Sequence, residues 1–300
     1  MLTNFFNKSK PITTVIILMF FSCFFVGAII NQIIPLNTAL YLPLFLLILG
    51  VFNFITSKNN LTFDNAYAFL FFVLLYGFFP EGLKISPTFY SNVALLLFLR
   101  KVYSLQSSKN LVLKFFDGGL WLGVSFLIEP FSAVYGVLLY AAILYHQKIT
   151  IHAVFVPIIG FFTLVFLYFT YCYWYNLPND FTRLFNWYTP YNFTFYKQPA
   201  YIISIVAFIL IVIVSIVLKT PKAFAVKNTF RINWILVLIN LGVAISLIIL
   251  TSKRNGSELS YAFFPAAIII ANALELFKKK WFSDIILGLF IIGAFVMLFI

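Results

Sequence analysis

The stretch GGLWLGVSFLIEPFSAVYGVLLYAAILY, residues 118–145, decides how the rest of the chain is interpreted. It is an apolar run interrupted near its middle by Glu129 and Pro130. A carboxylate at the centre of a bilayer costs about 2.5–3.5 kcal/mol on insertion scales, and proline removes a helical hydrogen bond. The pair is therefore expected at a membrane surface or in a wet cavity, as the turn between two short helices.

The composition of the whole sequence is that of an integral membrane protein. Hydrophobic residues make up 63% of the 300 residues and charged ones 9%, whereas soluble domains are about 25% charged. No polar stretch is long enough for a separate aqueous domain, so we expect residues 1–300 to form one membrane domain. The net charge of +12 is attributed to loop lysines that orient the chain, and not to nucleic-acid binding.

Hydropathy predicts an all-α polytopic transmembrane bundle of about ten to eleven segments. A crossing helix needs roughly 17–25 apolar residues, and the stretches that satisfy this are Pro11–Ile30, Ala39–Ile55, Thr150–Trp174, Tyr201–Leu218, Ile232–Leu250, Ser260–Phe277 and Ile285–Ile300. Shorter pieces are expected inside the bundle or beside a polar cavity, and these are Ala66–Phe79, Phe89–Leu99, Gly118–Ile128 and Phe131–Tyr145.

The positions of Lys and Arg decide how often the chain crosses. With a cytoplasmic N-terminus and residues 118–145 as a hairpin that turns outside, most of these cations lie inside. The cations left outside are Lys84, Arg183, Lys197, Lys253 and Arg254. A single kinked helix would divide the cations almost evenly, and cytoplasmic loops normally carry the excess, so the hairpin is preferred. We therefore predict a multi-pass protein of a bacterial inner membrane with its N-terminus in the cytoplasm.

Signatures of familiar catalytic and metal sites are absent from the sequence. It has no glycine-rich phosphate loop, no His-Glu-x-x-His and no Gly-x-Ser-x-Gly. Its two histidines, His146 and His152, flank a predicted inner loop and are expected to be solvated. We therefore expect no metal ion and no cofactor.

Acidic residues on the predicted outer side are the best candidates for chemistry. Asp64 and Asp117 directly precede apolar segments on the inner side, where a carboxylate would cap a helix. Glu81 and Glu129 have few polar neighbours in the sequence. A carboxylate held beside Lys or Arg at a membrane edge can bind a lipid-linked phosphate and accept a proton. We therefore predict Glu81 and Glu129 as catalytic residues.

A substrate-binding set is predicted around these carboxylates. It comprises outer cations and two aromatic residues of the segment that follows Tyr171: Lys84, Arg183, Arg254, Trp187 and Tyr188. Trp and Tyr also favour the lipid headgroup level. The aromatic segment is thus either an interfacial stretch on the outer leaflet or a wall that stacks on a sugar or grips a lipid tail.

Part of the chain, residues 91–145, resembles a stretch of the GT-C superfamily of polyprenyl-phosphate-dependent membrane glycosyltransferases. The resemblance is a pattern of lengths that covers under a fifth of the chain. A short helix ends in Leu99-Arg100-Lys101, a basic loop carries Lys109 and Lys114, and Glu129-Pro130 splits two half-length helices. The whole chain also resembles an uncharacterised family of bacterial inner-membrane proteins that open with a short polar stretch, here Phe5-Phe6 to Lys10-Pro11.

The resemblance to the GT-C enzymes implies a core with an outward-facing cavity. In such a cavity a carboxylate acts as base and cations hold the phosphate of a polyprenyl donor. These enzymes usually carry an acid in the first outer loop, whereas this chain has Asn31, Gln32 and Asn37 there.

Two function classes follow from these features, with a third behind them. One is sugar transfer from, or binding of, a polyprenyl-phosphate-linked sugar in envelope glycan assembly. The alternative is a non-catalytic membrane subunit or assembly factor on a degenerate glycosyltransferase scaffold. A transporter ranks third, because the later spans hold few deep polar residues. Membrane lipids, with polyprenyl phosphate as the candidate substrate, are the expected partners, and the sequence identifies no protein partner.

Overall fold

The computed structural model describes residues 2–186, 193–226, 228–251, 254–277 and 280–298. Regular structure in these ranges is helical throughout. Within them, 8 helices are long and apolar enough to cross a membrane, and two shorter apolar helices span Tyr67–Phe78 and Pro130–Tyr145. The expected all-α polytopic bundle is confirmed.

Contacts divide the chain into two compact units. Unit 1 comprises residues 1–85, 192–237 and 254–300, and unit 2 comprises residues 86–191 and 238–253. Each unit is described by itself. That residues 1–300 form one membrane domain stays a prediction.

Unit 1 contains most of the transmembrane helices. Its α-helices are α1 (Leu2–Phe6), α2 (Pro11–Ile30), α3 (Leu42–Lys58), α4 (Tyr67–Phe78), α10 (Pro199–Phe224), α12 (Phe263–Leu274), α13 (Lys280–Leu298) and the first part of α11 (Asn228–Leu250). Short 3₁₀ helices join them: η1 (Leu36–Tyr41), η2 (Pro80–Leu83), η6 (Thr194–Lys197) and η7 (Ser257–Ala262).

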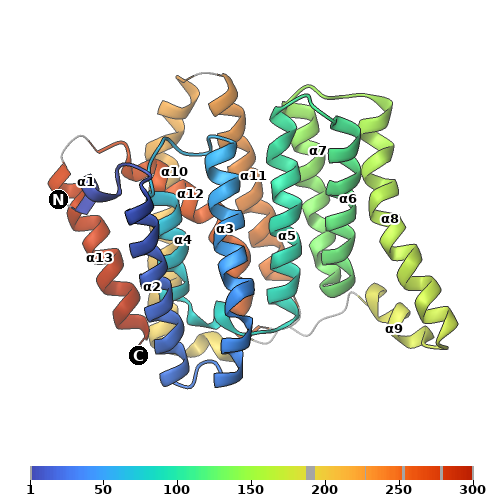
Figure 1. The fold of residues 1–300 in the computed structure, drawn as a ribbon, viewed down its shortest axis with the longest axis horizontal. Helices are drawn as coiled ribbons and strands as arrows, with labels where there is room; N and C mark the ends of the chain where they lie inside the picture. The colour runs from blue at the N-terminus through green and yellow to red at the C-terminus, as the bar shows by residue number, and fades with distance from the viewer. Residues whose placement is uncertain (1, 187–192, 227, 252–253, 278–279, 299–300) are drawn as a thin grey trace. The chain divides into compact units, whose positions relative to one another are not determined.

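Two short helices form the centre of unit 1. Every residue of α12, and every residue of α4 from Tyr67 to Gly77, is buried. Helices α2, α3, α12 and α13 all contact α4, and α10 packs on α12 (Figure 1). Because lipid does not reach these two helices, neither has to span a bilayer by itself. The expectation that the short segment Ala66–Phe79 lies inside the bundle is confirmed.

Unit 2 is built around three long helices, α5, α6 and α8, with the shorter α7 beside them. Its α-helices are α5 (Pro87–Tyr103), α6 (Leu111–Ile128), α7 (Gly136–Tyr145), α8 (Ile151–Trp174), α9 (Pro178–Thr182) and the last part of α11. Its 3₁₀ helices are η3 (Ser104–Gln106), η4 (Pro130–Tyr135) and η5 (Arg183–Phe185). Helix α6 packs against both α5 and α8.

The predicted turn at Glu129-Pro130 is confirmed. Helix α6 ends at Ile128, and Glu129 adopts an extended conformation with φ −133° and ψ 98° before η4 leads into α7. The chain returns to the end at which α6 began, because Lys148 Nζ donates to Ser108 Oγ at 2.7 Å. Figure 1 shows α6 and α7 side by side.

Helix α6 is longer than the half-length segment expected at Gly118–Ile128. It begins at Leu111, and its 18 residues are enough for a crossing. The first turns of α6 contain the charged residues Lys114 and Asp117, and both have partners. Lys114 donates to the Ser104 carbonyl at 2.6 Å, and Asp117 pairs with Lys101 at 2.5 Å. The prediction that Asp117 caps a helix was therefore wrong.

The predicted cap at Asp64 was also wrong. The side chain that accepts from the start of α4 is Asn65, whose Oδ1 takes the Tyr67 N–H at 3.1 Å. The Asp64 side chain is instead exposed.

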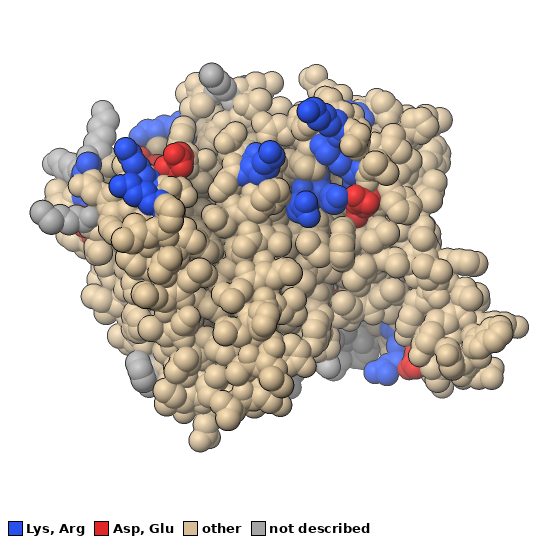
Figure 2. Space-filling view, in the orientation of Figure 1, with Lys and Arg blue, Asp and Glu red and all other residues tan. Residues whose placement is uncertain are grey.

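Within each unit, charged side chains lie at the helix ends and the apolar middle is bare of them (Figure 2). In unit 1, one end carries α1 and the ion pair of Lys219 with Glu275, 3.3 Å apart. We call this the α1 end, and the opposite end, at which η2 and η7 lie, the η2 end. The grouping agrees with the sides assigned from Lys and Arg, while the orientation in a membrane stays a prediction.

Candidate functional site

Two 3₁₀ turns meet at the η2 end of unit 1, and each carries a glutamate. Turn η2 holds Glu81 directly after α4, and η7 holds Glu258 directly before α12. Proline explains the first turn, because Pro80 has no N–H to continue α4. Glycine explains the second, because Gly256 has φ +87°, which L side chains rarely adopt. Both buried central helices therefore present a carboxylate at the same end.

Each carboxylate accepts a hydrogen bond from a tyrosine. The Tyr201 hydroxyl, at the start of α10, donates to Glu81 Oε2 at 2.5 Å, and the Tyr196 hydroxyl of η6 donates to Glu258 Oε1. The Asn255 N–H donates to Glu258 Oε2 at 3.2 Å. Glu81 is 9% exposed and Glu258 0%. Among the described residues neither has a Lys or Arg ion pair, so hydroxyls and an amide satisfy these buried groups.

These groups pack closely around one backbone position. A Cβ on Gly256 would lie 2.5 Å from the Tyr201 hydroxyl and 3.0 Å from Glu81 Cγ. The rings of Tyr196 and Tyr201 are 5.9 Å apart. We call Glu81, Gly256, Glu258, Tyr196 and Tyr201 the carboxylate cluster.

Two of the predicted cations lie beside this cluster, each over an aromatic ring of the segment before α10. Lys84 Nζ is 5.8 Å from the centre of the Phe195 ring, and Arg254 Cζ is 4.2 Å from that of Phe193. Both cations are half-buried. Stacking on an aromatic ring holds a cation in place. Of the predicted site residues, the structure thus brings Glu81, Lys84 and Arg254 to the same end of unit 1.

Tyr196 is held in its protonated form. Burial, and then the carboxylate of Glu258, raise the pKa of its hydroxyl above the ordinary value of a tyrosine. The hydroxyl therefore remains a hydrogen-bond donor to Glu258 throughout the physiological pH range.

The other predicted catalytic residue, Glu129, belongs to unit 2. It is 6% exposed, at the end of α6. The Arg183 segment lies beside this end, because Leu184 packs with Phe126. The guanidinium of Arg183 is itself exposed and lies 3.9 Å from Asp180. Trp187 and Tyr188 lie outside the described residues.

Of the five members of the carboxylate cluster, sequence reasoning identified Glu81 and missed four: Tyr196, Tyr201, Gly256 and Glu258. The tyrosines were counted in the aromatic segment that was expected to be either an interfacial stretch or a wall against a sugar or a lipid tail. A usable signal stood next to Glu258, since Asn255-Gly256 is a turn-forming pair that marks a tight bend between two spans. Two such bends, at Pro80 and at Gly256, could have indicated that their glutamates lie at the same end.

The expectation that His146 is solvated was wrong. It is half-buried, and its Nε2 is buried without a hydrogen-bond partner among the described residues. Within those residues no group of three His, Cys, Asp or Glu side chains could hold a metal ion.

Comparison with known proteins identifies a family but no function. The sequence model of a family of unknown function, DUF6427, matches residues 1–300. Neither the curated proteins nor the solved structures contain a match to the chain. The predicted likeness to an uncharacterised family is confirmed at this level, and the likeness to GT-C glycosyltransferases stays a prediction. The chain belongs to DUF6427, a family of unknown function, along its whole length.

Proposed function

We propose that this membrane protein binds a polyprenyl-phosphate-linked sugar at the η2 end of unit 1 and transfers the sugar to an acceptor hydroxyl. The observation that carries the proposal is the carboxylate cluster: two glutamates, nearly or fully buried and held by tyrosines, with Lys84 and Arg254 alongside. Buried carboxylates next to cations are suited to proton transfer and to phosphate binding.

The roles of the residues follow from their exposure. Glu81 retains some exposure and can reach an acceptor, whereas Glu258 is fully enclosed. Glu81 takes the proton of the acceptor hydroxyl, and the hydroxyl oxygen attacks the anomeric carbon of the donor sugar. The bond from this carbon to the phosphate oxygen breaks, and polyprenyl phosphate leaves with the electron pair. Lys84 and Arg254 stabilise the charge on the departing phosphate.

Glu258 acts as a positioning residue. Its hydrogen bonds to Tyr196 and to the Asn255 amide fix the η7 turn, and the same turn brings Gly256 against Glu81. Glu129 and Arg183 are kept as candidates on unit 2.

Sugar transfer is tested with purified protein in nanodiscs and a panel of polyprenyl-phosphate-linked hexoses. Glu81→Gln keeps an oxygen for the Tyr201 hydroxyl but cannot take a proton. We expect it to lower the transfer rate about 10²–10⁴-fold while donor binding is retained. Wild-type protein that transfers no hexose, or E81Q protein that is fully active, would contradict the proposal.

Donor binding is tested separately with polyprenyl phosphate alone. Lys84→Gln combined with Arg254→Gln should weaken binding by at least about tenfold, because two charge-assisted contacts are lost. Lys222→Gln is the matched control, since Lys222 is an exposed lysine in the last turn of α10, at the opposite end of that helix from Tyr201. Equal affinity of the double variant and the control would contradict a phosphate site here.

A non-catalytic subunit is the second candidate, and the first loop favours it. Asn31 lies in the first predicted outer loop, the loop in which the GT-C enzymes usually carry an acid, and it donates from Nδ2 to the Leu298 carbonyl at 2.5 Å at the end of α13. For a purely structural cluster, E81Q and E258Q lower the melting temperature and wild-type protein shows no transfer. Co-purification of a stoichiometric membrane partner would then favour the subunit over the enzyme.

A further inference from the structure

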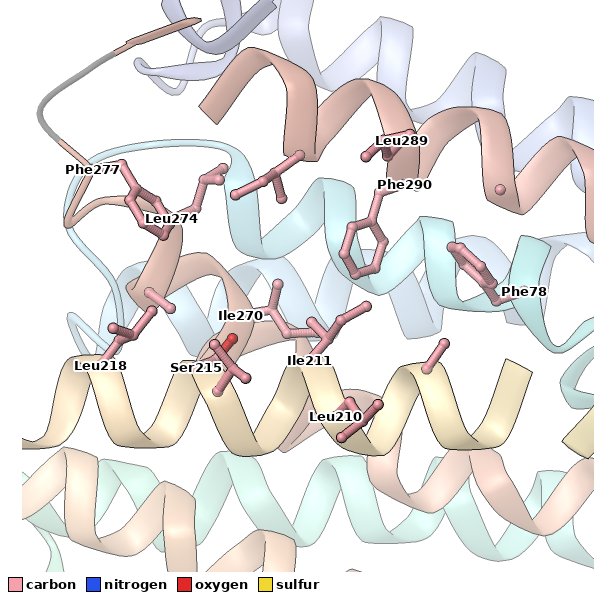
Figure 3. Close-up of a pocket in the computed structure, with 15 residues that line it drawn as sticks. Phe78, Leu210, Ile211, Ser215, Leu218, Ile270, Leu274, Phe277, Leu289 and Phe290 are labelled. Carbon is pink, nitrogen blue, oxygen red and sulfur yellow. The ribbon is translucent and has the colours of Figure 1, made fainter. Parts of the chain in front are cut away.

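A long apolar groove runs along unit 1 between α10 and α13 (Figure 3). Its volume is about 460 Å³, and Ser215 is the one polar side chain among its 15 lining residues. Leu210, Val214 and Leu218 form one wall at a spacing of one helical turn, Leu289 lies on the other, and α12 supplies the floor. Both walls are exposed, so the groove opens sideways to where lipid would lie.

The groove has a closed end and an open end. At the η2 end, α10 and α13 meet where Ser204 Oγ donates to Met297 Sδ at 3.0 Å, one turn beyond the first lining residue of α10. At the α1 end the groove reaches Leu274 and Phe277. A chain lying in the groove therefore has its free end toward η2 and its polar attachment at the α1 end.

A polar cavity adjoins the open end. It measures about 310 Å³ and shares Leu274 and Phe277 with the groove. Its other walls are largely polar and come from the α1 segment, the loop before α4 and the start of α13. A tail-sized apolar groove next to a headgroup-sized polar cavity matches the two parts of a membrane lipid.

The charges in this cavity have both signs. Lys280 is exposed and donates to Asn4 Oδ1 at 2.7 Å. Glu275 is already saturated by Asn65 at 2.5 Å and Lys219 at 3.3 Å. Asp64 is exposed and makes no hydrogen bond or ion pair with any described residue. Among the described residues that line the cavity, the cation Lys280 and the carboxylate Asp64 match a headgroup that carries a phosphate and an ammonium.

We propose that unit 1 holds a diacyl phospholipid with an amine headgroup, of the phosphatidylethanolamine type. One acyl chain lies in the groove, the phosphate faces Lys280, and the ammonium faces Asp64. Glu275 is already paired with Lys219, so a headgroup without the ammonium would leave the carboxylate of Asp64 without a positive partner. The site lies at the opposite end of unit 1 from the carboxylate cluster and does not depend on sugar transfer.

The first experiment measures which lipid the protein retains. Protein is exchanged into nanodiscs made of equal parts phosphatidylethanolamine and phosphatidylglycerol, released into mild detergent, and analysed by native mass spectrometry. We expect one retained phosphatidylethanolamine per chain, with a preference over phosphatidylglycerol of at least about fivefold. Equal retention of the two lipids, retention of a polyprenyl lipid in their place, or a dimer that closes the groove would overturn the proposal.

Two neighbouring residues supply a matched pair for the groove. Val214 is 53% exposed and lines it, whereas Ile213 is 51% exposed on the same helix and does not. Val214→Trp should reduce lipid retention at least about tenfold, while Ile213→Trp should leave it unchanged. Because both residues are exposed, neither substitution disturbs the core, and equal retention by the two variants would overturn the assignment of the groove.

Substitutions in the cavity test the headgroup. Asp64→Asn should remove the preference for phosphatidylethanolamine, since the ammonium loses its partner. Lys280→Gln should weaken retention of both lipids, and Lys222→Gln, outside the cavity, should change neither. An unchanged preference in D64N would overturn the amine assignment. Transfer activity of these variants equal to wild type would separate this site from the proposed sugar-transfer site.

Discussion

At the scale of single residues, Gly256 is the position on which the carboxylate cluster most depends. It provides the left-handed backbone that turns the chain into η7. It also leaves the space into which Tyr201 and Glu81 pack. Neither property is available to an L side chain, so the two requirements coincide in one glycine.

Gly256→Ala should destabilise the protein by about 1–3 kcal/mol, because it adds backbone strain and a methyl 2.5 Å from the Tyr201 hydroxyl. Melting in detergent, followed by intrinsic fluorescence, measures the loss. Gly288→Ala is the control, since nothing lies within 4 Å of its added methyl and alanine is the better helix former. Equal melting of the two variants would show that the cluster does not require glycine.

His146 gives a prediction about pH. Its burial, and then the charge of Lys148, lower the pKa from 6.5 to about 4. Between these values the unfolded chain binds more protons than the folded one, so the free energy of unfolding decreases as the pH falls. The stability that the neutral His146 provides is fully present above pH 6.5 and is lost as the pH falls toward 4.

The melting temperature of wild-type protein should therefore fall toward pH 4 more steeply than that of His146→Gln. Thermal melts at half-unit steps from pH 8 to pH 4 measure this difference. Parallel curves for the two proteins across the whole range would contradict a neutral, buried His146.

At the scale of helices, the crossing of α6 and α8 is set by glycines. A Cβ on Gly119 would lie 2.0 Å from the Pro157 carbonyl oxygen, and one on Gly160 would lie 2.3 Å from that of Phe116. Gly119 and Gly123 form a small-xxx-small pattern, which allows helix backbones to approach closely in a membrane. Helices α6 and α8 can therefore lie this close only because Gly119 and Gly160 have no side chains at the crossing.

Gly160→Ala should lower stability by about 1–3 kcal/mol, because backbone atoms cannot yield to the methyl and the two helices must separate. The melting temperature in detergent measures the effect. Gly136→Ala is the comparison, since its methyl would meet the Leu122 side chain at 3.6 Å, an ordinary contact. A Gly160→Ala protein as stable as Gly136→Ala would show that the crossing tolerates a wider separation.

At the scale of the whole molecule, the charged residues at the two ends of each unit indicate how the protein is oriented in the membrane. In unit 1 the ion pair of Lys219 and Glu275 lies at the α1 end, and the carboxylate cluster lies at the other. In unit 2 the contacts of Lys101, Lys114 and Lys148 share one end, and Asp180 with Arg183 lies at the other. The positive-inside rule predicts that the lysine-rich end of each unit faces the cytoplasm.

Cysteine labelling tests this orientation in intact cells. In a background with Cys23 and Cys172 changed to serine, Gln32→Cys and Asn179→Cys should react with a membrane-impermeant maleimide. Ser108→Cys and Lys222→Cys should react only after the membrane is permeabilised. The reverse pattern would invert the topology, and a mixed pattern within one unit would contradict the crossings assigned to that unit.

Much of the fold was predictable because the bilayer restricts it. The turn at Glu129 followed from the cost of a charge and a proline in lipid, and the buried position of α4 followed from its length. The start of α6 was not predictable in this way. Hydropathy treats Lys114 and Asp117 as polar residues that do not belong to a span. In the structure, hydrogen bonds and an ion pair with residues at the end of α5 satisfy both side chains.

In the candidate site, too, some residues could be predicted from the sequence and others could not. Glu81, Lys84 and Arg254 were identified because charge near an apolar span is conspicuous in the sequence. Glu258 and Tyr201 were not, because their partners are 62 and 120 residues away in the chain. Hydrogen bonds over such separations leave no local pattern.

The sequence by itself determined that the chain is an all-α multi-pass membrane protein that turns at Glu129. Hydrophobic length and charge are local properties, and the bilayer acts on them directly. Only the tertiary structure decided which polar groups share an end and which helices leave a groove between them. Those features depend on how separate helices pack, and packing depends on the shapes of side chains that are distant in sequence.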